Sequence, residues 1–284
     1  MKPAACYLSS LLMLLGFYIS PASAEISKFQ TPLEQAQWHF SGNAFGCSLS
    51  QRIADFGKVR LVAAPGRPTK LELDADWLSN AGATKAWVIP ASWNPPFVPK
   101  TETNMVWVGF KAYSTAKNVD GFLEGLEQGN SWQINVDAPQ RYQAVANAIN
   151  TSKPVMAFRM CRRNMVPKPF DYVRQRTLLF ATSSAQLSPK DETELYYVAR
   201  YVIADKHIKK VLVDGYADVS NDSLVSLVLS KERSQNVASR LIELGVPPKL
   251  IRVFHHGNRS PVAPNTTKAD RQLNRRVTIR LVKA

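Results

Sequence analysis

Hydrophobic and polar residues alternate in short runs over the first half of the chain, and this alternation is typical of β-strands. Prolines at positions 90, 95 and 96 separate some of these runs, as expected for the connections between strands. The pattern therefore predicts a sheet-rich first half, with strands over residues 58–62, 70–75, 86–89, 105–110 and 155–158.

Two stretches of the same half repeat apolar residues at helical spacing instead. In residues 116–128, the side chains of Val119, Phe122 and Leu126 share one face, and Gly129 is suited to end the helix. Residues 139–149 show the same spacing, and a proline at position 139 suits a first helical turn. We expect one helix in each stretch.

In the second half of the chain, segments with the alternating pattern of strands take turns with segments that have helical spacing. Strand patterns cover residues 176–180, 211–217, 251–254 and 277–282. Ser188, followed by Pro189 and Asp191, predicts a helix start, and a longer helical pattern ends at Leu244 before Gly245. The order strand, helix, strand, helix, strand, strand predicts a two-layer α/β sandwich, so the fold class of the whole chain is α+β.

A chain of 284 residues is long enough for two domains. Two prolines in residues 166–171 make a short, stiff connection there, so we expect domains over residues 25–168 and 169–284. Residues 1–24 have the pattern of a cleavable export signal, with one lysine, an apolar run and an Ala-Ser-Ala box. The mature chain would then have no membrane span; a retained N-terminal anchor is the alternative.

The predicted export determines how the three cysteines are interpreted. Removal of Cys6 with the signal leaves Cys47 and Cys161, and an even pair in an exported protein favours a disulfide. Two cysteines do not make a zinc site, and no histidine lies near either of them in sequence. The pair therefore predicts a structural bond and no reactive thiol.

The net charge of the chain and its lack of catalytic motifs limit the classes of function that the sequence supports. The formal net charge of +14 fits an anionic envelope surface or simply a basic surface, and export argues against nucleic acid as the partner. The sequence contains no catalytic constellation, so we predict neither an enzyme nor a cofactor. His255 and His256 are adjacent on a predicted strand and point to opposite faces, which argues against a shared metal.

All six tryptophans lie in the first half of the chain. Most aromatic side chains of a sheet-rich domain belong to its core. Trp93 is the exception, because it lies in a proline-rich stretch where burial is harder to arrange. We therefore predict that Trp93 contacts a partner.

A candidate binding site lies where the predicted strand over residues 211–217 ends. Asp218 follows that strand, while Ser226, Ser230 and Arg233 form one stripe of the next helix. A carboxylate and a guanidinium beside one shallow pocket suit a zwitterion, because Asp218 can accept from an ammonium and Arg233 can hold a carboxylate. The alternative is a surface salt bridge that contributes about 0–1 kcal/mol.

The second half resembles the OmpA-like peptidoglycan-binding domain through motifs that recur in order: Gly-Tyr-Ala-Asp at 215–218, Leu-Ser-Lys-Glu-Arg-Ser at 229–234, Leu-Gly-Val at 244–246, His-Gly-Asn-Arg-Ser-Pro at 256–261, Asn265, and Asn-Arg-Arg-Val at 274–277. The resemblance implies that Asp218 and Arg233 bind the diaminopimelate of a peptidoglycan stem peptide. It places further site residues at Ala217, Ser226, Leu229, Ser230 and Arg276. Ser226 stands where the family has asparagine, so one contact to the stem peptide is in doubt.

The first half resembles the MotY family of flagellar motor proteins at residues 35–38, 92–96 and 120–126. This resemblance implies a periplasmic ring component at the flagellar basal body. Its first domain would dock on the basal body and on a MotX-like partner, and its second domain would hold the cell wall so that stator units resist torque. A general envelope tether with another partner is the alternative; a wall-cleaving enzyme would need catalytic residues that the sequence lacks.

Overall fold

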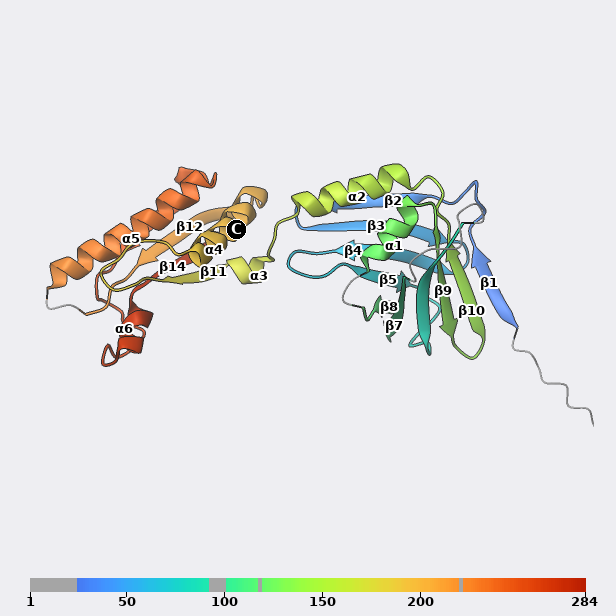
Figure 1. Cartoon of the computed structure of the whole chain (residues 1–284), viewed down its shortest axis with the longest axis horizontal. Coiled ribbons are helices and arrows are strands. Elements are labelled where there is room, and N and C mark those ends of the chain that lie inside the picture. Colours follow the sequence, from blue (N-terminus) through green and yellow to red (C-terminus); the bar gives the residue numbers. More distant parts are fainter. Residues whose placement is uncertain (1–24, 92–100, 117–118, 220–221) are drawn as a thin grey trace, which may run out of the picture.

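The computed structural model describes residues 25–91, 101–116, 119–219 and 222–284. These residues form two β-sheets with associated helices, joined by a short connection (Figure 1). Each sheet has its own hydrophobic core, one formed by residues between Trp38 and Phe158 and the other by residues between Val166 and Leu281. The predicted export signal and Trp93 lie outside the described residues.

The first sheet has ten strands in the order β1-β10-β9-β6-β7-β8-β5-β4-β3-β2. The pair β1 and β10 is parallel, and the other neighbours are antiparallel. The predicted strands over residues 58–62, 70–75, 86–89 and 105–110 are confirmed as β4 to β7. The strands are β1 (Ile26–Gln30), β2 (Trp38–Asn43), β3 (Gly46–Ile53), β4 (Gly57–Ala63), β5 (Lys70–Asp74), β6 (Thr84–Ile89), β7 (Glu102–Val108), β8 (Lys111–Ser114), β9 (Ser131–Asp137) and β10 (Arg141–Ala146).

The first core lies between this sheet and the helices α1 (Asp120–Glu127) and α2 (Ser152–Asn164). Phe122 of α1 and Phe158 of α2 are buried with Trp132, whose indole donates to the Phe122 carbonyl at 2.8 Å. Asn147 follows β10 and joins it to β3 and β2, because its carbonyl accepts from Gln51 at 2.9 Å and from Trp38 at 2.7 Å. The helix predicted over residues 116–128 is therefore present as α1, with the predicted apolar face inward.

Two predictions for the first half are wrong. The helix expected over residues 139–149 is strand β10, which pairs with β9 on one side and with β1 on the other. Hydrogen bonds from two neighbouring strands decide the conformation of a stretch whose apolar spacing fits either period. The strand expected over residues 155–158 is part of helix α2, in which Val155 and Phe158 share the buried face.

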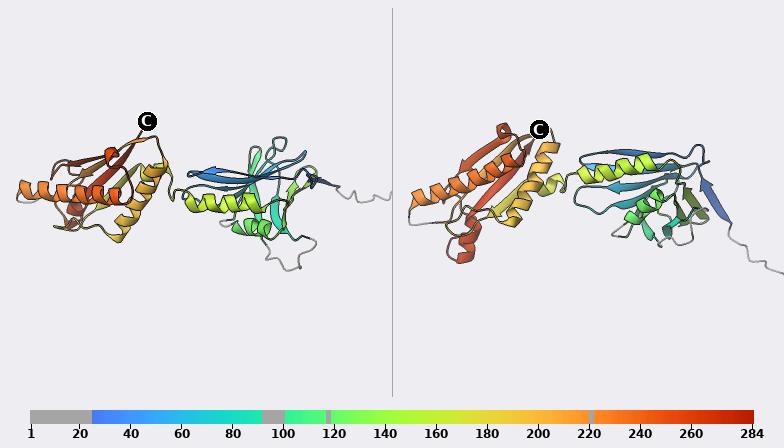
Figure 2. Two further views of the ribbon diagram at one scale, coloured as in Figure 1. Left: turned by 90° about the horizontal axis from the view of Figure 1, so that it is seen from above. Right: turned by 45° about the horizontal axis from the view of Figure 1, so that its top comes forward.

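The second sheet has four strands in the order β11-β14-β12-β13. Helices α4 and α5 lie on the same side of it (Figure 2). Ser188 caps α4 through a capping box with Asp191, and Gly245 follows α5 with a positive φ of 95°, so both predicted helix boundaries are confirmed. The elements are α3 (Phe170–Val173), β11 (Gln175–Leu179), α4 (Pro189–Ala204), β12 (Ile208–Gly215), α5 (Ser223–Glu243), η1 (Pro248–Leu250), β13 (Ile251–His255), α6 (Lys268–Asn274) and β14 (Arg276–Lys283).

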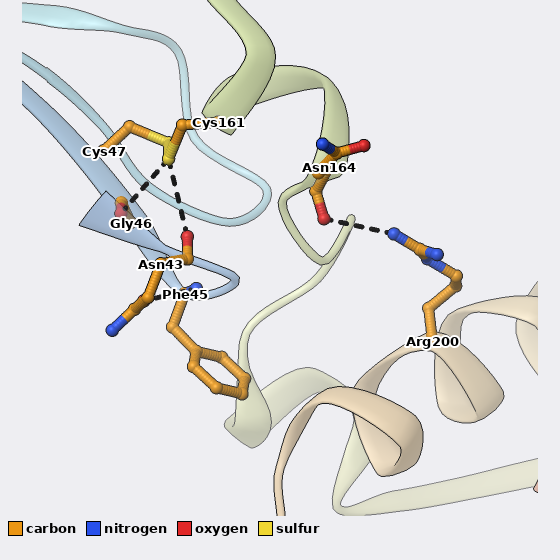
Figure 3. The surroundings of a disulfide bond; sticks show 7 residues. All are labelled: Asn43, Phe45, Gly46, Cys47, Cys161, Asn164 and Arg200. Atoms are coloured by element: carbon orange, nitrogen blue, oxygen red, sulfur yellow. Dashed lines mark hydrogen bonds between the residues drawn. A yellow bond between two sulfur atoms is a disulfide. The ribbon is translucent and has the colours of Figure 1, made fainter. Parts of the chain in front are cut away.

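The predicted disulfide between Cys47 and Cys161 is present, and it joins β3 to α2 across 114 residues (Figure 3). The tip of the β2–β3 hairpin lies beside it and reaches the second core. Phe45 packs against Tyr201 with ring centroids 5.3 Å apart, and the Ala44 carbonyl accepts from the Val166 N–H at 2.9 Å. The first domain thus contacts the second beside the covalent bond that fixes the hairpin to α2.

A second contact crosses the same junction. Arg200 of α4 donates to the carbonyl of Asn164, the last residue of α2, at 3.1 Å (Figure 3). Among the helices that the structure describes, none combines the length and apolar character needed to cross a membrane.

Candidate functional site

Asp218 lies just beyond the end of β12, in a segment that is held from both sides. The Tyr216 N–H donates to the Arg276 carbonyl at 2.8 Å, and the Ala217 N–H donates to the Gly257 carbonyl at 2.7 Å. Gly215 allows α5 to approach this strand closely, because a Cβ there would lie 2.2 Å from the Ser230 carbonyl oxygen. The backbone therefore presents Asp218 at a fixed place at the edge of the sheet.

The carboxylate of Asp218 pairs with Arg275, which the sequence did not single out as a site residue. Arg275 Nη1 lies 2.9 Å from Asp218 Oδ2, and the same guanidinium donates to the Phe180 carbonyl at 3.0 Å. The Arg275 side chain is 7% exposed and that of Asp218 is 18% exposed. Asp218 thus keeps one accessible side while Arg275 fixes the other.

A hollow of about 380 Å³ opens beside this pair. Lys268 and Arg271 of α6 and Arg275 after it lie at helical spacing, so one face of this segment presents three cations to the hollow. The Asp218 carboxylate is the acidic group in its lining. The hollow can therefore accept an ammonium at Asp218 and carboxylates at the surrounding cations. Its lining residues are Thr182, Asp218, Lys268, Arg271, Gln272 and Arg275.

Arg233, the predicted partner of Asp218, is buried beneath the hollow and does not line it. Its guanidinium donates to the backbone carbonyls of Ser184 at 2.8 Å, Ala181 at 3.2 Å and Tyr216 at 3.3 Å. The side chain has 0% exposure, and within the described part of the chain no hydrogen bond joins it to Asp218. Arg233 therefore ties together the strand β12 and the segment that follows β11.

Burial lowers the pKa of Arg233 to about 10, although the nearby Asp218 carboxylate acts to raise it. Arg275 acts in the same direction as burial. The guanidinium remains charged at neutral pH, so Asp218 lies in the field of two arginines, one in contact with it and one beneath it.

The other predicted residues of α5 hold the segments around the site. Ser226 Oγ donates to the Asp218 carbonyl at 3.2 Å. Ser230 Oγ donates to the Leu227 carbonyl at 2.8 Å and accepts from the Gly257 N–H at 3.0 Å. Both serines and Ala217 are buried, and Leu229 is half-buried. These residues position the Asp218 segment against α5.

Arg276 points away from the hollow. Its guanidinium lies 3.8 Å from the centroid of the Tyr216 ring and donates to the Ser260 carbonyl at 3.1 Å. Asn274, one residue before Arg275, organises the neighbouring loop, since its side-chain oxygen accepts from the Val262 and Ala263 N–H groups at 2.8 and 3.2 Å. The Asn-Arg-Arg motif thus serves three different purposes with three adjacent side chains.

The two adjacent histidines have different surroundings. His256 Nε2 lies 3.0 Å from Asp214 Oδ1, while His255 is exposed. In the described ranges, no group of three or more histidine, cysteine, aspartate or glutamate side chains is placed to hold a metal ion.

Two family models match the chain. Residues 29–167 match the MotY N-terminal domain, and residues 179–275 match the OmpA family. The OmpA match agrees with the observed helices and sheet, and the predicted fold class, α+β with a second α/β sandwich, is confirmed.

Two curated relatives match different shares of the chain. The sodium-type flagellar protein MotY of Vibrio parahaemolyticus is 26% identical over 257 residues, which are 87% of this chain and 88% of that protein. The outer-membrane lipoprotein YfiB of Pseudomonas aeruginosa is 36% identical over 102 residues, 36% of this chain and 60% of that lipoprotein. Neither relative is named for an enzymatic activity, in agreement with the prediction from the sequence.

A solved structure also matches the second domain. The peptidoglycan-associated lipoprotein of Burkholderia pseudomallei is 24% identical, with a TM-score of 0.36, and the match covers 38% of this chain and 90% of that one.

Proposed function

Since the chain joins a MotY N-terminal domain to an OmpA-family domain, we propose that it is a periplasmic component of the flagellar motor that binds peptidoglycan. It forms part of a T-ring-like structure at the basal body and helps to recruit and anchor stator units around the rotor. Residues 1–24 direct export and are then removed, so that the mature protein begins at Glu25 in the periplasm. The observation that carries the proposal is the charged hollow at Asp218 within the OmpA-family domain.

In this proposal the stem peptide of peptidoglycan enters the hollow. Diaminopimelate offers an ammonium to Asp218 and a carboxylate to Arg275, with Lys268 and Arg271 at its rim. Arg233 contributes through the carbonyls that it holds, and Ala217, Ser226, Leu229, Ser230 and Arg276 position the surrounding backbone. The site therefore divides into residues that touch the ligand and buried residues that keep the first group in place.

The first domain, residues 25–168, docks on the basal body and on a MotX-like partner, and Trp93 belongs to that contact. The disulfide supports this role, because it stabilises a domain whose sheet must keep its shape under load. In the chain-entropy model, a disulfide that closes a loop of this length stabilises the folded state by about 4–5 kcal/mol.

A general envelope tether is the second candidate, favoured by the likeness of 102 residues of the chain to an outer-membrane lipoprotein. Deletion of the gene separates the two. Loss of swimming with normal cell-wall integrity supports the motor role. Normal swimming with a weakened envelope supports the tether.

Wall binding is tested by sedimentation of the mature chain with purified peptidoglycan. Asp218→Asn removes the negative charge and keeps the shape, so bound protein should fall about tenfold or more, since a charge-assisted hydrogen bond is worth about 1.5–3 kcal/mol. Asp76→Asn, at an exposed carboxylate of the first domain, is the matched control. Equal retention of both variants, with matched circular dichroism, would contradict the assignment.

A further inference from the structure

The second sheet has one face that no helix covers in the described part of the chain. Helices α4 and α5 pack on its other face, as the two views of Figure 2 show. On the uncovered face the strand register places Arg252, Leu212 and Arg280 side by side in one row, across β13, β12 and β14. The next row holds Phe254, Asp214 and Thr278.

Positive charge dominates these rows. Arg252 and Arg280 flank Leu212, and Arg276 lies one step further along β14 on the same face. Asp214 is the acidic side chain of these rows, and it is already engaged, because it lies 3.0 Å from His256 Nε2 and 3.0 Å from Arg280 Nη2. The face therefore has an excess of guanidinium groups.

Arg252 and Arg280 are exposed, and hydrogen bonds and ring contacts restrict the guanidinium groups of this face. Arg252 Nη1 donates to the carbonyls of Lys249 and Ile251 at 3.0 and 2.9 Å. The Tyr216 ring stacks on the His256 ring, with 4.7 Å between centroids, and the Arg276 guanidinium lies 3.8 Å from the Tyr216 ring centroid. Guanidinium groups fixed in this way recognise carboxylates at defined spacings.

Apolar side chains lie among the arginines. Phe254 on β13, Val282 on β14 and Leu179 on β11 are all exposed, at 45%, 38% and 41%. The strand β13 is an edge of the described sheet, so its outer backbone groups can pair with another strand, apart from the Ile251 carbonyl that accepts from Arg252. Fixed cations, apolar side chains and a free strand edge together suit an extended acidic polypeptide better than a lipid surface, which needs neither a strand edge nor fixed spacing.

We propose that the uncovered face of the second sheet, centred on Arg252, Leu212 and Arg280, binds an acidic extended segment of a partner protein. The carboxylates of that segment pair with Arg252 and Arg280, which lie about 10 Å apart across two strand spacings. Its apolar side chains pack on Phe254 and Leu212. This surface is distinct from the hollow at Asp218, so the second domain binds the wall and a protein partner at the same time.

The test measures binding of a fluorescein-labelled octapeptide of alternating glutamate and leucine to the mature chain, residues 25–284, by fluorescence anisotropy. The double variant Arg252→Glu, Arg280→Glu should weaken binding at least about tenfold, because each lost guanidinium removes a charge-assisted pair. The double variant Lys190→Glu, Lys231→Glu makes the same change in net charge at exposed positions of α4 and α5, and should leave binding nearly unchanged. Thermal unfolding shows that both variants fold.

Equal weakening by the two double variants would overturn the proposal, since it would show attraction to net charge alone. Three further results would also overturn it. The first is tighter binding to phosphatidylglycerol vesicles than to the peptide, lost in the Arg252/Arg280 variant. The second is a wild-type dimer that this variant disrupts, and the third is loss of peptidoglycan sedimentation in this variant. Peptidoglycan binding that persists while peptide binding is lost separates this face from the proposed wall site.

Discussion

Replacement of Arg233 by alanine should strongly lower the stability of the second domain, whether or not Arg233 also contributes to wall binding. The side chain is fully buried, and its guanidinium holds the carbonyls of Ala181, Ser184 and Tyr216. Alanine would leave these three acceptors without their donor and would leave a cavity the size of the lost side chain. An arginine that only gripped a ligand would show neither effect.

The magnitude follows from those contacts. A hydrogen bond to a charged group is worth about 1.5–3 kcal/mol, and three that share one donor group do not add fully. We therefore expect a loss of about 3–5 kcal/mol in the free energy of unfolding, as for other disrupted buried charge networks. For a domain of this size the midpoint of thermal unfolding should fall by more than about 10 °C.

The distribution of aromatic residues allows the two domains to be followed separately. All six tryptophans precede residue 133, so tryptophan fluorescence reports on the first domain, and far-ultraviolet circular dichroism reports on both. In Arg233→Ala the fluorescence transition should stay in place while the dichroism transition of the second domain moves to lower temperature. Arg240→Ala is the control, because the ion pairs of Arg240 in the described part of the chain, with Glu192 and Glu243, lie at the surface, and their loss should change stability little.

The reasoning is refuted if Arg233→Ala unfolds like the wild type and yet loses peptidoglycan. Arg233 would then act as a direct ligand contact, and its hydrogen bonds to the three carbonyls would contribute little to stability.

Three further predictions concern the rest of the chain. Cys161→Ser should lower the steady-state level of the exported protein on immunoblots, because a destabilised first domain is exposed to proteases; an unchanged level would argue against a stabilising bond. Burial acts to raise the pKa of Asp205, but hydrogen bonds from Lys283 and His207 lower it to about 2, so its stabilising effect is present above pH 4 and is lost as pH falls towards 2. Asp205→Asn should therefore cost about 2 kcal/mol in urea unfolding at pH 7 and flatten this acid dependence, whereas identical pH profiles would contradict it. Phe45→Ala should broaden the distribution of distances between the domains in small-angle X-ray scattering, and a wild-type distribution would show that the hairpin contact does not hold them.

The sequence predicted elements best where local chemistry and tertiary packing agree. Ser188 and Asp191 form a capping box without help from the rest of the chain, and Gly245 ends α5 through its own backbone conformation. The stretch over residues 139–149 lacks such a signal, and its strand exists because β9 and β1 supply hydrogen bonds from both sides. A partner strand distant in sequence cannot be read from apolar spacing alone.

The candidate site was predictable in part for the same reason. A strand followed by Asp218 places a carboxylate at the sheet edge, and the structure has it there. Arg275 was missed because the family resemblance places a site residue at its neighbour Arg276, whereas Arg275 follows α6 and turns towards Asp218. Its spacing from Lys268 and Arg271 was the available signal. The burial of Arg233 depends on the meeting of two distant chain segments, which no local pattern reveals.

Under the proposed function, the position of the hollow implies that the junction between the domains carries mechanical load. The hollow is lined by α6, which lies away from the first domain, and the junction lies at the other end of the second domain (Figure 1). A force applied by the wall at Asp218 must therefore pass through the second sheet to reach the first domain.

At the junction, direct contacts between the two domains accompany the connecting segment. Phe45 is packed on Tyr201, and Arg200 is bonded to the carbonyl of Asn164 at the end of α2. The disulfide ties the tip of the β2–β3 hairpin, through Cys47, to helix α2, so the contacts on the first domain share one covalently joined support. A flexible tether would need none of these contacts. Their presence favours a joint that transmits load with little change of angle, which a stator anchor requires and a passive envelope tether does not.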